Sequence, residues 1–476
     1  MRGWITGSTV HQHARSPFAV WCDAHAPPDA RDPENEFQEL LLRQGREHEA
    51  RVVAARYPGL APLDASSERE AFGLALDAMR AGAPVLLQAP LLLPSAQLGG
   101  RADVLLRDES APSIFGSYHY RVLEIKRARN LKAAHRLQGA FYTHVLGRIQ
   151  QRVPRTFTLV NADGAETLFE HDEREIEAVI EEIRAIRAGR PVAPAYGEGL
   201  WPWESFNDRK AVEADDVSLV DGVGPAVRGS LVAAGLATVR ALAAAREEHL
   251  QGIRGVGQVR RRKLPVAAGA LVSRTHVRIG DVRLPETPIE VFFDLEGTSE
   301  LVEDEVDPID YLVGCLERRD GEERYHSFVA HTLDGEERML RDFVSWLAER
   351  PQAILFHWHH YEATHMRTMC ERYQMMEAWR ELIQPRLRDL HKDATAAFAF
   401  PTYGTSLKKI APYLGFHWQH ADVNAMQSIA YYLDYVRDPV GQAGKLQKVL
   451  DYNEDDCRAT RVVKDWLVAQ GPSIPS

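Results

Sequence analysis

Apolar and polar residues alternate along the first half of this chain in two different periods. Residues 120–126 alternate with the period of a strand, which predicts a strand with one buried face. Mostly apolar runs at 85–93 and 156–160 predict further strands. Helical spacing of apolar residues predicts helices at 34–57, 74–80, 128–149 and 172–188. Strands interspersed with helices indicate an α/β fold.

The second half has another order of elements. Residues 189–208 are rich in Pro and Gly and break the periodicity, so they mark the end of a first domain. Residues 215–272 form short helical segments rich in Ala and Leu. Further on, strands are predicted at 289–298, 310–317, 324–330 and 353–357, with a helix at 334–350. This order predicts an antiparallel meander followed by a buried strand.

Length, charge and cysteine spacing limit the number of domains and the kinds of partner and site that this chain can have. A chain of 476 residues is too long for one hydrophobic core. The net charge of −11 gives no overall basic field, so a polyanion has to be met by local patches. No apolar run reaches the roughly 18 residues that a membrane span requires, and we expect a cytoplasmic protein with no membrane partner. Its 4 cysteines lack CxxC spacing, which argues against a disulfide framework or zinc knuckle.

A first group of charged residues has the composition of a hydrolytic metal site. Asp103 opens a short apolar run, and Glu124 and Lys126 lie two apart on a predicted strand, so they share one face. Two carboxylates hold a hard dication, and a neighbouring lysine positions and helps to deprotonate an attacking water. The competing interpretation is a surface hairpin with solvated charges.

The surroundings favour the metal site. Gln138 and Tyr142 are four apart on the next predicted helix and therefore lie on one face. Between residues 121 and 155 the chain carries nine Lys or Arg, including Arg127, and a single acid, which suits a polyanionic substrate. His48 on the 34–57 helix offers a further metal ligand, although lone helical histidines are more often structural.

Together these residues resemble the RecB-like branch of the PD-(D/E)xK nucleases. The family's elements are matched in order by Gly45/His48, Gly100/Asp103, Glu124/Lys126 and Gln138/Tyr142. The resemblance implies that His48, Asp103 and Glu124 bind Mg²⁺ or Mn²⁺, that Lys126 is catalytic, and that Gln138 and Tyr142 contact nucleic acid. Some relatives hold an iron–sulfur cluster at a Cys-Pro pair. Because Ser16-Pro17 stands at the comparable place, we expect no cluster.

The segment 215–272 contains two G-V-G turns between short helices. They are Gly222-Val223-Gly224 and Gly255-Val256-Gly257. Such glycines allow a phosphate to approach the free amides of the next helix. The pair resembles helix-hairpin-helix motifs, which bind the DNA backbone without reading sequence. Arg254 and Arg260 support this for the second turn, whereas the first is acidic; the alternative is that both turns only connect packed helices.

A second set of carboxylates lies in the C-terminal third. Asp294 and Glu296 share one face at the end of a predicted strand, and Tyr452 and Asp456 are four apart on a predicted helix. Here the chain resembles the DEDD exonucleases of the RNase H fold, in the YprB-type branch. The resemblance implies that Asp294, Glu296 and Asp456 are metal ligands and that Tyr452 orients the attacking water. Asp455 is an alternative ligand, but it lacks the four-residue spacing.

Two further features belong to the same resemblance. Glu362 stands where the family usually has its middle Asp, one methylene longer, and Lys408 lies in a matching S-L-K stretch. His357, His359, His360 and His365 raise the alternative of a zinc site. Because no cysteine and no acid other than Glu362 stands at fitting spacing, the sequence favours histidines that line the cleft.

We therefore expect an α/β multidomain protein with three parts. They are a restriction-endonuclease-like PD-(D/E)xK domain (1–200), a linker with a small all-α helix-hairpin-helix domain (201–285), and an RNase H-like DEDD 3′-5′ exonuclease domain (286–476). The expected function is a DNA nuclease with two sites, each using Mg²⁺ or Mn²⁺, two ions per site, on single-stranded DNA or free 3′ ends. A helicase partner fits a repair role. Alternatives are one active site with the other domain a clamp, a non-catalytic repair scaffold, and RNA as substrate.

Overall fold

The chain folds into two compact units. A computed structural model describes all residues except 1–2, 35, 64, 299–307, 421–422 and 472–476. The first unit is Met1–Ala211, and the second begins at Val212. The predicted helix-hairpin-helix segment thus lies within the second unit, and a division into three domains stays a prediction. Among the described residues, no helix is both long and apolar enough to cross a membrane.

The first unit combines one mixed sheet with helices. Its strands run in the order β1 (Val85–Leu93), β2 (Leu98–Asp108), β3 (His119–Ile125), β4 (Thr156–Val160) and β5 (Glu166–Glu170), with β3 and β4 parallel and the other pairs antiparallel. Its helices are α1 (Gly7–Arg15), α2 (Pro17–His25), α3 (Glu36–Arg56), α4 (Glu68–Arg80), α5 (Ala133–Ile149), α6 (Glu173–Arg187) and most of α7 (Glu204–Glu213), and short turns of 3₁₀ helix are Pro28–Ala30 and Pro94–Ala96. The predicted strands at 85–93 and 156–160 are confirmed.

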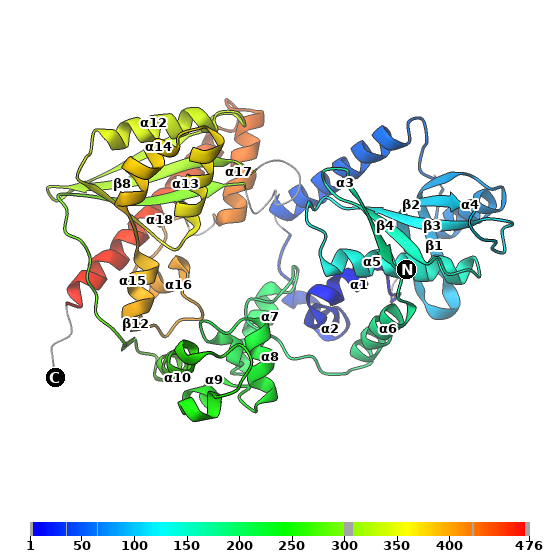
Figure 1. Ribbon diagram of the computed structural model, residues 1–476, viewed down its shortest axis with the longest axis horizontal. Coiled ribbons are helices and arrows are strands. Elements are labelled where there is room, and N and C mark those ends of the chain that lie inside the picture. The colour runs from blue at the N-terminus through cyan, green and yellow to red at the C-terminus, as the bar shows by residue number, and fades with distance from the viewer. Residues whose placement is uncertain (1–2, 35, 64, 299–307, 421–422, 472–476) are drawn as a thin grey trace. The chain divides into compact units, whose positions relative to one another are not determined.

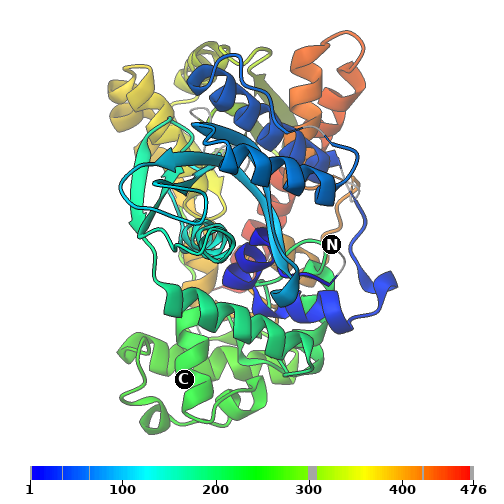
Figure 2. The same ribbon diagram turned by 90° about the vertical axis from the view of Figure 1, so that its right-hand side faces the viewer.

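The central strand β3 is buried on both faces, so the predicted single buried face is wrong. Val122 and Leu123, which point to opposite faces, are both buried, and so is Glu124. The reason is tertiary, because helices cover both sides of the sheet. Leu123 lies in a cluster with Val52 and Val53 of α3, whereas Val122 lies in the larger core with α1, α5 and α6. Figures 1 and 2 show α3 and α5 on opposite sides of this sheet.

Two predicted helices begin at other residues than expected. Helix α4 begins at Glu68 because the Ser67 side chain accepts a hydrogen bond from the Glu70 amide and caps it. Helix α5 begins only at Ala133, since the carbonyl of Ala128 accepts a hydrogen bond from Ala162 and holds this segment beside β4. Periodicity alone contains neither signal.

The second unit opens with helices and continues with a second mixed sheet. The helical part comprises 3₁₀ turns Val217–Leu219 and Glu247–Leu250 and helices α8 (Pro225–Ala233), α9 (Val239–Ala243) and α10 (Gln258–Ser273). A small sheet pairs β6 (Val277–Arg278) with β12 (Phe398–Ala399). The main sheet has the order β9 (Glu322–Val329), β8 (Asp310–Arg319), β7 (Ile289–Gly297), β10 (Ala353–His357) and β11 (Leu387–Asp389).

Strands β7, β8 and β9 form the expected antiparallel meander, and β10 and β11 run parallel to β7. Remaining helices are α12 (Glu336–Ala348), α13 (Tyr361–Arg372), α14 (Met376–Ala378), α15 (Leu390–Ala397), α16 (Leu407–Tyr413), α17 (Ala425–Arg437) and α18 (Ala443–Ala469), with a π turn at Trp379–Ile383 and a 3₁₀ turn at Gln384–Arg386. Phe292 packs with α15, α16 and α18, while Phe293 stacks on Phe343 of α12. Helices therefore cover both faces of this sheet too (Figure 1).

The two G-V-G turns have the same backbone geometry. Gly222 and Gly255 both have φ of +82°, a conformation that favours glycine, and Gly224 and Gly257 each precede the first residue of a helix, α8 and α10. The sequence repeat is therefore a structural repeat.

Candidate functional site

Three acids of the second unit converge at one end of its main sheet. Asp294 and Glu296 lie on β7, and Asp456 lies on α18. One carboxylate oxygen from each lies within 4.8 Å of the other two, an arrangement that could hold a metal ion. The strand places the first two acids on one face, and the long helix brings the third from far along the chain. Oxygen donors of this kind suit Mg²⁺ or Mn²⁺.

A ring of polar side chains fixes the first two acids. Asn453, which is fully buried, donates from Nδ2 to Asp294 Oδ2 over 2.7 Å and accepts at Oδ1 from the Tyr325 hydroxyl over 2.8 Å. Ser428 donates from Oγ to Glu296 Oε2 over 3.2 Å. These contacts hold the carboxylates in place from the protein side. The sequence prediction did not include Asn453, although its position directly after Tyr452 was an available signal.

Asp456 and Asp455 have different hydrogen-bond partners, and these show which of the two belongs to the acid cluster. The Trp418 indole donates from Nε1 to Asp456 Oδ1 over 2.7 Å, and Lys408 Nζ lies 4.0 Å from the same oxygen. Asp455 instead accepts hydrogen bonds from the backbone amides of Gln419 and His420, at 2.8 and 3.3 Å. Asp455 therefore orders a loop, and Asp456 is the residue that the structure groups with Asp294 and Glu296.

Tyr452 lies between a cation and an acid. Lys408 donates to its hydroxyl and lies 3.9 Å from the ring centre, and the hydroxyl hydrogen-bonds to Asp456. Burial and then the charge of Asp456 raise the pKa of Tyr452 far above its usual value. The hydroxyl thus keeps its proton and can donate a hydrogen bond to a water or a phosphate oxygen. Lys408 thus positions Tyr452, and its predicted contact with nucleic acid stays a prediction.

The crowding of acids changes their protonation. Burial, followed by the charge of Asp456, raises the pKa of Glu296 to about 8 and that of Asp294 well above its usual value. Burial also raises the pKa of Asp456 to about 6, against the opposing effect of Lys408. Carboxylates forced together in this way lose protons readily only when a cation joins them. The electrostatics therefore favour a metal-binding cluster.

Comparison with known proteins agrees with this geometry. Residues 291–468 match the family model of the RNase H superfamily. The C-terminal region is thus an RNase H-like domain, and it indicates a metal-dependent, nuclease-type hydrolase acting on nucleic acid. All three clustered acids lie inside the matched region. Neither a curated protein nor a solved structure matches the chain.

Glu362 lies beside this cluster without joining its group of three. It is buried in the first turn of α13, its Oε2 lies 3.4 Å from His357 Nδ1, and its charge contributes to the raised pKa of Asp294. Its place as a metal ligand stays a prediction. The other histidines of this segment have different partners. His365 Nδ1 lies 2.9 Å from Asp310 Oδ1, whereas the rings of His359 and His360 lie 4.2 Å apart, tilted by 53° to each other.

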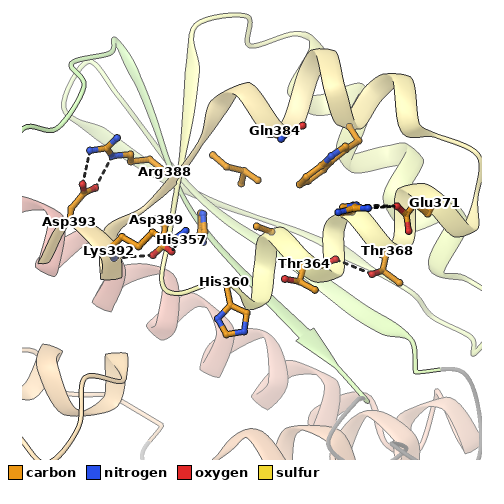
Figure 3. A pocket seen from close by; sticks show the side chains of 14 residues that line it. His357, His360, Thr364, Thr368, Glu371, Gln384, Arg388, Asp389, Lys392 and Asp393 are labelled. Atoms are coloured by element: carbon orange, nitrogen blue, oxygen red, sulfur yellow. Dashed lines mark hydrogen bonds and ion pairs between the residues drawn. The ribbon is translucent and has the colours of Figure 1, made fainter. Parts of the chain in front are cut away.

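A cavity of about 650 Å³ opens beyond His357 (Figure 3). Residues of β10, α13, β11 and α15 line it, and its three cations each pair with an acid of the same wall. The pairs are Arg367 with Glu371, Arg388 with Asp393 and Lys392 with Asp389. Because these charges cancel, the cavity is not a basic cradle for a phosphate backbone.

The first unit brings together the predicted Asp103, Glu124 and Lys126. Asp103 is the middle residue of β2, Glu124 lies near the end of β3, and Lys126 directly follows that strand. Lys126 Nζ lies 2.8 Å from Glu124 Oε2 and 3.9 Å from Asp103 Oδ2. The Asp103 amide donates to Glu124 Oε1 over 3.1 Å, and the Ile125 amide donates to Asp103 Oδ2 over 2.8 Å. Glu124 is fully buried, so this is no solvated surface hairpin.

A third acid that the sequence reading missed faces this site. Gln88 donates from Nε2 both to Glu49 and to Asp103 Oδ1, the latter over 3.3 Å. Burial and then the charge of Asp103 raise the pKa of Glu49 to about 7. Burial and then Asp103 likewise raise the pKa of Glu124 to about 8. Glu49 follows His48 directly, which was the available signal.

His48 itself is buried on α3, and burial and then Arg51 and Arg127 lower its pKa. Among the described residues, no compact group of three metal-ligand atoms joins His48 to Asp103 and Glu124. Its role as a metal ligand therefore stays a prediction, as does contact of Arg127 with nucleic acid.

Tyr142 packs against two glycines, Gly100 of the resemblance and Gly7, which the resemblance does not include. A Cβ on Gly100 would lie 2.8 Å from Tyr142 Cε1, and one on Gly7 2.5 Å from its Cζ, so both positions leave room for this ring. Gln138 hydrogen-bonds to the Tyr142 hydroxyl, as helical neighbours four apart can. Tyr142 is largely buried, and this burial, followed by the charges of Glu124 and Asp103, raises the pKa of its hydroxyl above the usual value.

The helical hairpins differ in how their charges are used. In the first, Asp216 binds Arg228 through two hydrogen bonds of 2.8 and 2.7 Å, and Asp221 accepts one from Thr405 over 3.1 Å. In the second, Arg260 donates to the carbonyl of Gly255 over 2.8 Å and remains exposed.

All four cysteines are buried free thiols.

Proposed function

We propose that this protein is a metal-dependent nuclease whose C-terminal domain trims 3′ ends of single-stranded DNA. The observation that carries the proposal is the cluster of Asp294, Glu296 and Asp456 within an RNase H-like domain. These residues would hold Mg²⁺ or Mn²⁺, which when bound activates water and neutralises charge on the scissile phosphate. Tyr452 would orient the attacking water through its retained proton, and Lys408 would fix the tyrosine hydroxyl.

The first unit supports a second site of the RecB-like PD-(D/E)xK kind. Asp103 and Glu124 supply oxygen ligands, and Lys126 is held within hydrogen-bonding distance of one of them. Burial lowers the pKa of Lys126, but the charges of Glu124 and Asp103 outweigh this and raise it. Without a metal the lysine is therefore a cation that neutralises the acids. A bound dication would take over that role and free the lysine to act on a water or on the phosphate.

The helical hairpins complete the proposal as a sequence-independent DNA contact. Repeated G-V-G geometry and the exposed arginines of the second turn support backbone binding there. The engaged acids of the first turn favour a connecting role for it. A chain that joins two such sites fits DNA repair or processing, with a helicase as a fitting partner.

A cleavage assay with Mn²⁺ tests the proposal. End-labelled single- and double-stranded DNA and RNA are compared for wild type, Lys126→Ala, Asp294→Ala and the double variant. Activity lost only in the double variant means two working sites, and loss in one single variant identifies the active unit. If the wild type binds DNA in a salt-dependent way without cleaving it, the protein is a non-catalytic DNA-binding scaffold. If cleavage is unchanged in every variant, neither proposed site is an active site. The RNA arm decides the sugar preference.

A further inference from the structure

Helices α5 and α6 carry a cluster of metal-ligand side chains outside both nuclease sites. His144 and Arg148 lie four apart on α5, and Glu173 and Glu177 lie four apart on α6, so each pair occupies one helix face. One ligand atom each from His144, Glu173 and Glu177 lies within 4.8 Å of the other two. The two helices thus present an imidazole and two carboxylates to a single point.

The imidazole is the informative member. His144 is 4% exposed, and its Nδ1 is buried with no hydrogen-bond partner in the structure. This nitrogen lies 4.0 Å from Glu173 Oε1, which is too long for a hydrogen bond but suits two ligands of one ion. A buried polar atom without a partner costs free energy. A bound cation would remove that cost, because neutral imidazole is a good metal ligand.

Arg148 is the existing competitor for the two carboxylates. Its Nη2 lies 2.9 Å from Glu173 Oε1 and 2.7 Å from Glu177 Oε1. The side chain is 47% exposed, so it can turn into solvent without leaving a cavity. Exposed ion pairs of this kind contribute little stability. A divalent cation that also gains the buried nitrogen can therefore displace the guanidinium.

We propose that His144, Glu173 and Glu177 form a site for Zn²⁺ that joins α5 to α6. One nitrogen and two carboxylate oxygens are a donor set that Zn²⁺ accepts, with water in a fourth position. Mg²⁺ prefers oxygen ligands alone and would leave the imidazole unused. This link goes beyond catalysis: it fixes the helix that also carries Gln138 and Tyr142.

Calorimetric titration of the full chain with Zn²⁺ tests this. Glu173→Gln/Glu177→Gln changes only part-exposed residues and should still fold, and it should lose one Zn²⁺ equivalent or weaken its binding at least about tenfold. Glu181→Gln, one turn further along α6 and paired with Arg184 instead, is the matched control and should bind like wild type.

Two further variants make the result specific. His144→Gln should lose the same equivalent, and Arg148→Met, which removes the competitor, should bind Zn²⁺ about two- to fivefold more tightly. Thermal unfolding of the wild type should shift upward with Zn²⁺, and that of the double variant should not. Zn²⁺ binding that is the same in the double variant and in Glu181→Gln, or unaltered by Arg148→Met, would overturn the proposal.

Discussion

Replacing Gly314 with alanine should disable the C-terminal site through a single added methyl group. Gly314 lies in β8, and a Cβ there would overlap Asn453 Oδ1 and lie 2.7 Å from its Cγ and 3.0 Å from the Tyr325 hydroxyl. Asn453 is fully buried on α18 and cannot swing into solvent. It must shift, and it then loses its hydrogen bonds to Asp294 and Tyr325.

The magnitude follows from these contacts. Overpacking costs about 1–3 kcal/mol, and each buried group left without its partner costs about 1–3 kcal/mol. Alanine recovers roughly 0.5–1 kcal/mol of strand stability relative to glycine. With two hydrogen bonds lost, to Asp294 and to Tyr325, the net loss is about 2–8 kcal/mol, which at roughly 2–4 °C per kcal/mol lowers the unfolding temperature of this unit by about 4 °C or more. Loss of the Asn453 contact to Asp294 should reduce activity about 10- to 100-fold.

Scanning calorimetry and the Mn²⁺-dependent exonuclease assay measure both effects. Gly269→Ala is the control, because nothing lies within 4 Å of its added Cβ in α10, and it should stabilise the chain slightly. In an Asn453→Ala background the obstacle is gone, so Gly314→Ala should then cost little. Wild-type stability and activity in Gly314→Ala, or an equal cost in both backgrounds, would refute the reasoning.

Three other outcomes are expected. Because the pKa of Glu296 is raised to about 8, the metal-free second unit should lose stability as the pH rises from about 4.5 to about 8. Mn²⁺ binds the deprotonated carboxylate, so it should raise the unfolding temperature of this unit more at about pH 8 than at about pH 5.5. Equal shifts of the unfolding temperature at the two pH values, measured by calorimetry, would contradict this. With the C-terminal site inactivated, Glu49→Gln should lower Mn²⁺-dependent cleavage about tenfold or more, and unchanged rates would exclude Glu49 from the first site. Trp418→Phe removes the indole donor to Asp456 and should cut exonuclease activity about tenfold with little change in circular dichroism, so full activity would show that this contact is dispensable.

Local sequence determined most of the elements of this protein. Periodicity predicted β1, β4 and β10 at their observed residues, and the i, i+2 spacing of Glu124 and Lys126 correctly predicted that they meet, because a strand's geometry fixes which side chains share a face. The same rule placed Asp294 beside Glu296. Where capping or strand contacts set the end of a helix, as at Ser67 and Ala128, periodicity alone was insufficient.

Only the tertiary structure decided which distant residues meet. Nothing local shows that Glu49 faces Asp103 through Gln88, that Asn453 fills the space left by Gly314, or that β3 is covered on both faces. These relations arise when helices pack on both sides of a sheet, and packing depends on residues far apart in sequence. Sequence spacing thus supplied the pairs Glu124/Lys126 and Asp294/Glu296, and folding brought the remaining acids to them, because one strand or one helix turn presents only two side chains to the same point.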